Sequence, residues 1–244
     1  MSTLLIAVIL FITIIAGGLL VFISTISGKT LKLILSFSGA FLFAISVLHL
    51  LPDIYVRGGG MVGVYILIGF FIQILMEYFS EGIEHGHIHL HDHDHNEKNN
   101  FPVVMMLALS IHSFLEGMPL GQQYEGNGEL VRSLFVGITL HNIPISIALM
   151  SMLLQSHLKR TKAFFWLCIF ALMTPAGMLV SQLIGQGMAS DVLSHYYNNI
   201  MALVVGIFLH ISTTILFESS ENHRFNLVKF AAIIGGALLA FISA

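Results

Sequence analysis

Residues 101–122 read FPVVMMLALSIHSFLEGMPLGQ, a mostly apolar run that is long enough to cross a lipid bilayer as a helix. The run nevertheless contains two ionisable side chains, His112 and Glu116. A charged side chain at the centre of a membrane helix costs about 3 kcal/mol or more, so a residue of this kind is functional by default. The stretch therefore predicts a membrane helix that carries a polar site.

The rest of the chain has the same apolar character. Hydrophobic residues make up 56% of the 244 residues and charged residues only 9%. A soluble domain of this size could not bury so many apolar side chains away from water. Cys168 is the only cysteine, so no intrachain disulfide can form, and the net charge of -3 gives no reason to expect a nucleic-acid partner. We expect an all-α polytopic protein of the lipid bilayer, with one transmembrane domain over residues 1–244.

The apolar runs predict eight transmembrane helices, each of roughly 20 residues or more. Their predicted positions are about 3–26, 31–53, 59–80, 101–122, 130–155, 161–187, 198–218 and 225–244.

The lysines and arginines predict the orientation of these helices. If the N-terminus lies outside, the inner loops hold Lys29, Lys32, Lys98, Lys159, Arg160, Lys162, Arg224 and Lys229, and the outer loops hold only Arg57 and Arg132. This bias follows the rule that cytoplasmic loops carry the excess of lysine and arginine. We therefore expect both termini to be extracytoplasmic.

The loop at about 81–100 then faces the cytoplasm and contains EHGHIHLHDHDHNEK (84–98), in which histidines alternate with other residues. Neutral imidazoles in such a run bind metal ions loosely and in many arrangements. We expect this loop to modulate the activity of the protein without being required for it, the alternative being a dispensable loop with incidental affinity.

A second polar segment echoes the first. His112 and Glu116 are four residues apart and share one helix face, and His141-Asn142-Ile143-Pro144-Ile145 in the fifth predicted helix repeats the pattern without the glutamate. Two imidazoles and a carboxylate are typical zinc ligands and leave a coordination position open. A buried histidine also serves as a helix–helix hydrogen-bonding group, and Ser113 and Asn142 either orient the ligands or bond neighbouring backbone.

These motifs resemble the ZIP (Zrt/Irt-like) family of divalent-metal transporters, in its bacterial type. That family has eight helices, both termini outside, a histidine-rich loop between helices three and four, and H-[NS]-x-x-E-G in helix four, which here reads HSFLEG (112–117). HLLPD (49–53) and TPAG (174–177) also fit the family pattern. The resemblance implies alternating access and uptake of zinc, or a similar divalent ion, into the cytoplasm.

The sequence also departs from the family. Many members hold two metal ions and have glutamates where this chain has Ile145 and Thr174, and an asparagine can stand at the position of Ser113. The first metal position keeps His112, Glu116 and His141. We therefore expect a mainly mononuclear site.

Three further residues are candidate metal ligands. His49 and Asp53 lie at the predicted outer end of helix two, where they form either an outer relay site or an ordinary polar helix end. His210 lies inside the seventh predicted helix and is a candidate auxiliary ligand.

Other functions stay open at this point. The chief alternative is an intramembrane zinc-dependent hydrolase, although Ser113 stands where an H-E-x-x-H protease has its glutamate. A receptor that binds metal without transporting it is a further alternative. We expect no enzyme activity and no prosthetic group, with Zn²⁺ as the transported substrate and iron, manganese and cadmium as other candidate ions. A homodimer is an open option, and without an organellar signal we expect the cell membrane, the inner membrane in a bacterium.

Overall fold

The computed structural model describes residues 2–24, 26–80, 103–121, 128–218 and 227–243, and the regular elements within these ranges are helices. Seven helical stretches are long and apolar enough to cross a membrane, and a shorter apolar helix, α10, follows them. The predicted all-helical fold is thus confirmed, with seven helical stretches long enough to span a membrane and α10 as a shorter eighth apolar helix.

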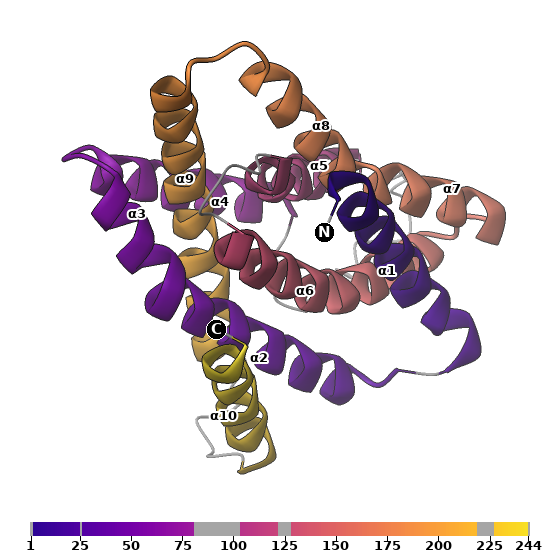
Figure 1. Cartoon of the computed structure of the whole chain (residues 1–244). Helices are drawn as coiled ribbons and strands as arrows, with labels where there is room; N and C mark the ends of the chain where they lie inside the picture. Colours follow the sequence, from indigo (N-terminus) through magenta and orange to yellow (C-terminus); the bar gives the residue numbers. More distant parts are fainter. Residues whose placement is uncertain (1, 25, 81–102, 122–127, 219–226, 244) are drawn as a thin grey trace.

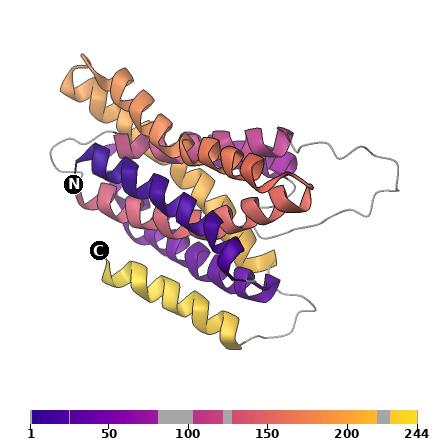
Figure 2. The ribbon, with the colours of Figure 1, turned by 90° about the vertical axis from the view of Figure 1, so that its right-hand side faces the viewer.

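The α-helices have the following bounds. In chain order they are α1 (Thr3–Ile23), α2 (Gly28–Ile45), α3 (Leu51–Arg57), α4 (Val62–Ser80), α5 (Val103–Gly117), α6 (Gly128–Gln155), α7 (Arg160–Ala171), α8 (Met173–Gly185), α9 (Ser190–Glu218) and α10 (Leu227–Ile242). Figure 2 shows that α1 begins and α10 ends at the same end of the bundle, as an even number of crossings requires.

Helix α9 begins at Ser190, before the predicted start of the seventh span at about 198. Hydropathy alone assigned the polar residues 190–197 to a loop. In the structure Tyr197 and Asn198 are buried, and the Asn198 side chain donates a hydrogen bond to the Ile54 carbonyl in α3 at 3.3 Å. Tyr197, which lies before the predicted span, therefore packs into the bundle as part of α9.

Three predicted spans are interrupted near a proline. Proline lacks a backbone N–H and its ring clashes with the carbonyl four residues earlier. A π-helical turn (Ser46–Leu50) joins α2 to α3 just before Pro52, and α5 gives way to a 3₁₀ turn (Met118–Gly121) that contains Pro119. Helix α7 ends at Ala171, the residue four before Pro175, so the predicted helix over 161–187 is two helices.

The helices pack in two groups. In the α5 group, α1 lies along α6, α7 and α8, and α5 lies along α8. In the α4 group, α4 lies along α9, and α2 lies along α9 and α10, with α3 also against α9; Figure 1 shows α10 beside α2. The two groups meet chiefly where α2 contacts α6 and α4 contacts α5.

Glycines bring the helix backbones together within each group. A Cβ at Gly177 of α8 would overlap the Phe114 carbonyl oxygen of α5, and a Cβ at Gly206 of α9 would overlap the Ile66 carbonyl oxygen of α4. Small residues at such crossings let membrane helices approach closely. Dispersion forces then hold the helices together, because the hydrophobic effect does not drive their association in lipid. The glycines therefore stabilise each group internally.

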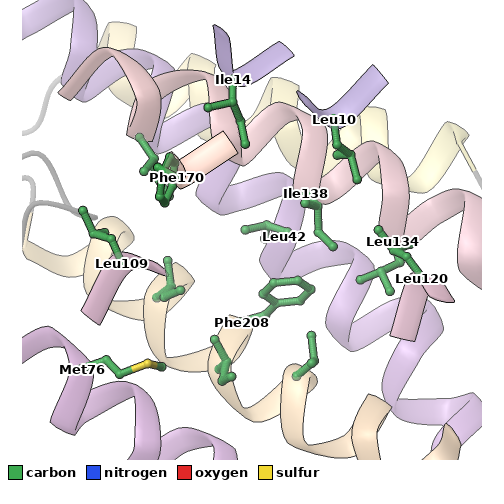
Figure 3. Close-up of a cluster of buried hydrophobic side chains, with 14 of the residues drawn as sticks. Leu10, Ile14, Leu42, Met76, Leu109, Leu120, Leu134, Ile138, Phe170 and Phe208 are labelled. Carbon is green, nitrogen blue, oxygen red and sulfur yellow. The ribbon is translucent and has the colours of Figure 1, made fainter. Parts of the chain in front are cut away.

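The centre of the bundle is filled by apolar side chains from both groups. Figure 3 shows Leu10, Ile14 and Ile138 from the α5 group near Leu42 and Phe208 from the α4 group. Large apolar side chains also cover the outside, including Phe71, Leu107, Leu183 and Phe230. An apolar exterior over an apolar core is what a helix bundle in lipid requires.

Candidate metal centre

Helix α5 presents His112 and Glu116 on one face, as their spacing predicts. Both side chains are fully buried, and His112 Nε2 lies 2.9 Å from Glu116 Oε1. Gly117 allows the end of this helix to touch the Thr174 backbone of α8, so close helix packing shields the pair from lipid.

Helix α6 supplies the third member, His141, which is also fully buried. The His112 and His141 rings are 6.2 Å apart between centroids and nearly perpendicular, at 80°. One ligand atom from each of His112, Glu116 and His141 lies within 4.8 Å of the others. The two helices with matching motifs thus face one another across a single cluster, as the sequence predicted.

The chemistry of this cluster suits a divalent cation. The second carboxylate oxygen of Glu116, Oε2, receives no hydrogen bond from the described residues, and a buried carboxylate without such bonds is costly. A cation held between the carboxylate and the imidazoles would remove that cost. Two nitrogens and one carboxylate match the ligand set of an open zinc site.

Gln73 of α4 also contacts the cluster. Its side chain is fully buried, and its Oε1 lies 3.1 Å from His112 Nδ1. Sequence analysis missed this residue. It could have been identified from FFIQILM (70–76), in which a single amide side chain lies in an otherwise apolar membrane helix.

The two predicted orienting residues have different environments. Ser113 Oγ and Thr174 Oγ1 form a buried 2.8 Å hydrogen bond between α5 and α8. The Asn142 amide is buried beside His141, and neither its oxygen nor its nitrogen has a hydrogen-bond partner among the described residues. Asn142 is therefore the member of this pair with polar capacity left for a ligand or its water.

His49 and Asp53 lie apart from the cluster, on either side of the junction between the π turn and α3. With Arg57 and the α6 residues Glu129 and Ser133 they line a pocket of about 440 Å³. Asp53 Oδ1 accepts a 2.7 Å hydrogen bond from Arg57 Nε, which holds this carboxylate in an ion pair. Within the described ranges, these residues belong to no three-residue group with metal-ligand geometry.

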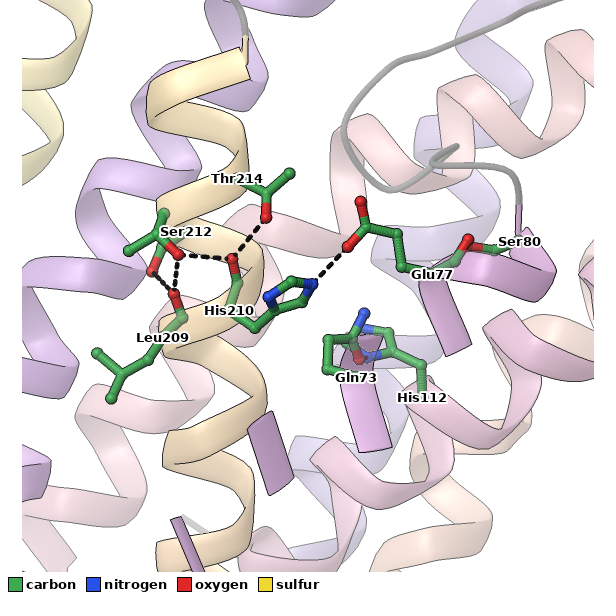
Figure 4. A network of polar contacts seen from close by, with 9 residues as sticks. Gln73, Glu77, Ser80, His112, Leu209, His210, Ser212 and Thr214 are labelled. Atoms are coloured by element: carbon green, nitrogen blue, oxygen red, sulfur yellow. Dashed lines mark hydrogen bonds and ion pairs between the residues drawn. The ribbon is translucent and has the colours of Figure 1, made fainter. Parts of the chain in front are cut away.

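His210 of α9 pairs with a residue of α4. Its Nε2 forms a short ion-pair contact with Glu77 Oε2, and its ring packs edge-on against Phe70 at 4.9 Å. Figure 4 shows Gln73 and Glu77 on the same helix, with the His112 ring beside Gln73 and the His210 ring turned toward Glu77. His210 therefore contacts α4 one helical turn after Gln73, the residue that contacts the cluster. The histidine-rich loop at 81–100 lies outside the described residues.

Comparison with known proteins adds independent findings. The family model described as "ZIP Zinc transporter" matches residues 85–244. The chain is 29% identical over 171 residues to Protein zntD of Dictyostelium discoideum and 33% identical over 135 residues to Zinc transporter ZIP3 of Bos taurus. These matches cover 66% and 54% of this chain, but only 24% and 41% of the respective relatives. The chain thus matches less than half the length of either relative.

Proposed function

Because the chain belongs to the ZIP zinc transporter family, we propose that it carries a divalent metal ion across the cell membrane through the cluster of His112, Glu116 and His141. The observation that carries this proposal is the geometry of the cluster, three fully buried ligand groups with atoms within 4.8 Å. An incomplete ligand shell suits transport, since a closed four-ligand site characterises structural zinc.

Zinc is the ion that we propose. Imidazole nitrogen with one carboxylate suits zinc better than it suits harder cations such as magnesium or calcium. The cattle relative is named as a zinc transporter, which supports the same choice. Iron, manganese and cadmium are the ions to compare in the assay.

We further propose that one ion is carried at a time. The positions where many family members have glutamates hold Ile145 and Thr174, and Thr174 is hydrogen-bonded to Ser113. A hydroxyl pair that is satisfied in this way has no charge with which to hold a second cation. The carboxylate and both imidazoles remain at the first position.

Movement of one helix group against the other would expose the cluster alternately to the two sides. His112, Glu116 and His141 all belong to the α5 group, whose helices touch through glycines. Inward movement of a doubly charged ion is favoured by an inside-negative potential, by about 2.3 kcal/mol per charge for each 100 mV. We propose uptake into the cytoplasm, with the loop at 81–100 modulating it.

The test is metal uptake into sealed proteoliposomes that contain a zinc-sensitive dye. We expect the native chain to raise the dye signal and Glu116→Gln and His141→Ala each to abolish it. Matched controls are Asp191→Asn and His195→Ala in α9, since both side chains are exposed and lie outside the cluster. They should transport at the native rate.

Absence of flux in the native chain would contradict transport. Native flux in both cluster variants would show that the ion takes another path. Hydrolytic activity without any gradient, lost in the cluster variants, would support the hydrolase alternative.

A further inference from the structure

We propose that Gln73 of α4 is a positioning residue that sets which nitrogen of His112 is presented to the metal. This inference rests on the proposed function, because it assigns a role toward the same ion. The contact that carries it is the buried 3.1 Å hydrogen bond between Gln73 Oε1 and His112 Nδ1.

The hydrogen bond determines where the imidazole proton resides. An amide oxygen accepts hydrogen bonds and cannot donate them, so Nδ1 must be the donor and must carry a proton. Nε2 is then the nitrogen that offers its lone pair to a metal ion when no proton lies between it and Glu116. That nitrogen lies 2.9 Å from Glu116 Oε1, on the side of the cluster, so Gln73 directs the metal-binding nitrogen toward the carboxylate.

The surroundings of Gln73 support a role in holding His112. The residues around it, from Phe70 to Met76, are apolar, and its own side chain is fully buried. A buried amide in an apolar membrane helix is costly unless it is hydrogen-bonded. Metal-binding histidines commonly donate their second N–H to such an acceptor, which fixes the ring and its tautomer.

The contact also joins the two helix groups. Gln73 lies on α4, which packs along α9, whereas His112 lies on α5, which packs along α8. Separation of α4 from α5 would break the bond and release the His112 ring from its fixed orientation. We infer that the cluster binds metal tightly while the groups are docked and loosens when they part.

The amide is also the right acceptor for an ion that must leave. A carboxylate in this place would make the imidazole a stronger ligand by accepting its proton more strongly. A neutral amide orients the ring with less effect on its basicity. Gln73→Glu should therefore tighten metal binding, and Gln73→Met, which keeps the length but lacks an acceptor, should weaken it.

The first experiment measures the Zn²⁺ affinity of the full chain in detergent, with Co²⁺ absorption as a check on coordination. All chains compared carry serine at the six histidines between 85 and 95, so that the loop does not bind the ion. We expect Gln73→Met to bind about 10- to 100-fold more weakly than the native chain and Gln73→Glu to bind at least as tightly. In proteoliposomes Gln73→Met should raise KM while the maximal flux is kept, since ground-state binding is lost. Gln182→Met is the matched control, because Gln182 of α8 is exposed, and it should bind and transport as the native chain does.

A second measurement needs no change at Gln73. In the metal-free native chain, ¹⁵N NMR of the histidine side chains should show a proton on His112 Nδ1, with the resonance identified from its loss in His112→Ala. A bare Nδ1 would overturn the inference. So would native affinity in Gln73→Met, or equal losses in Gln73→Met and Gln73→Glu, which would indicate a packing role.

The same binding measurements distinguish failure of the Gln73 role from failure of the proposed function. If native and His112→Ala chains bind Zn²⁺ alike, the cluster itself is wrong. If His112→Ala loses binding and Gln73→Met does not, only the role of Gln73 is wrong.

Discussion

The cluster residues show how ionisable side chains are accommodated inside an apolar bundle. His112 and Glu116 pair within one helix turn, and His141 faces them from α6. Each is fully buried, and removing one partner of such a pair leaves an uncompensated group that is strongly destabilising. The three side chains therefore depend on one another, and a bound metal ion would complete the set.

The number of bound ions tests the mononuclear proposal. A variant with the six histidines between 85 and 95 changed to serine should bind one Zn²⁺ per chain, because only one carboxylate serves the cluster. Adding Glu116→Gln to that variant should reduce the bound metal to none. Equilibrium dialysis with elemental analysis gives the count, and two ions per chain would contradict a single position.

The Ser113–Thr174 hydrogen bond is a second residue-scale feature with a measurable strength. Hydrogen bonds between membrane helices contribute about 0.6 kcal/mol on average, since the separated helices also find partners. A double-mutant cycle of Ser113→Ala and Thr174→Val should give a coupling free energy of about that size and no more than about 2 kcal/mol.

Unfolding in detergent measures this coupling. Ser113→Ala combined with Ser38→Ala is the control cycle, because Ser38 donates to the Leu35 carbonyl of its own helix. That pair should be additive. Zero coupling between Ser113 and Thr174 would mean that their bond does not contribute to holding α5 on α8.

At the scale of the elements, prolines and glycines shape the helices around the cluster. Pro119 and Pro175 mark the places where α5 and the α7–α8 segment change direction or type. The glycines then bring α5 and α8 into backbone contact. Because the cluster lies on α5, this packing sets the distance and angle at which His112 and Glu116 are presented.

Gly177→Ala tests this packing. The added methyl group would overlap the Phe114 carbonyl oxygen, so α5 and α8 must move apart, and overpacking of this kind costs about 1–3 kcal/mol. We expect a lower thermal unfolding midpoint in detergent and weaker Zn²⁺ binding, because His112 and Glu116 are carried on the displaced helix.

Gly28→Ala serves as its control, since nothing lies within 4 Å of a Cβ at that position. Alanine is the better helix former, so this variant should be at least as stable as the native chain. Equal stability of the two alanine variants would show that the α5–α8 contact tolerates separation.

At the scale of the whole molecule, the arrangement of the two helix groups and the membrane orientation would determine how the proposed transport proceeds. The groups meet along α2 with α6 and α4 with α5, and the cluster lies close to the second of these contacts, through Gln73. Orientation in the membrane stays a prediction from the eight inner and two outer basic residues.

Cysteine labelling in intact cells tests that orientation. In a Cys168→Ser background, Gly60→Cys lies between α3 and α4 on the predicted outer side, and Thr161→Cys lies in the first turn of α7 on the predicted inner side; both positions are exposed. A membrane-impermeant maleimide should label the first cysteine in intact cells and the second only after permeabilisation. The reverse pattern would invert the proposed topology and with it the direction of uptake.

The sequence by itself determined the helical fold, the approximate spans and the three cluster residues. These are local properties: an apolar run of about 20 residues implies a membrane helix, and a four-residue spacing places His112 and Glu116 on one face. A polar side chain in an apolar run can be recognised from the sequence alone. Gln73 could therefore also have been predicted as a site residue.

Only the tertiary structure decided which residues meet. The pairing of Gln73 with His112, of Ser113 with Thr174 and of Glu77 with His210 joins positions 39, 61 and 133 residues apart, and no local pattern specifies such contacts. The early start of α9 has the same origin, because it depends on how whole helices pack and satisfy polar groups, which outweighs local hydropathy. The division of the sixth span, in contrast, follows from Pro175, which is visible in the sequence.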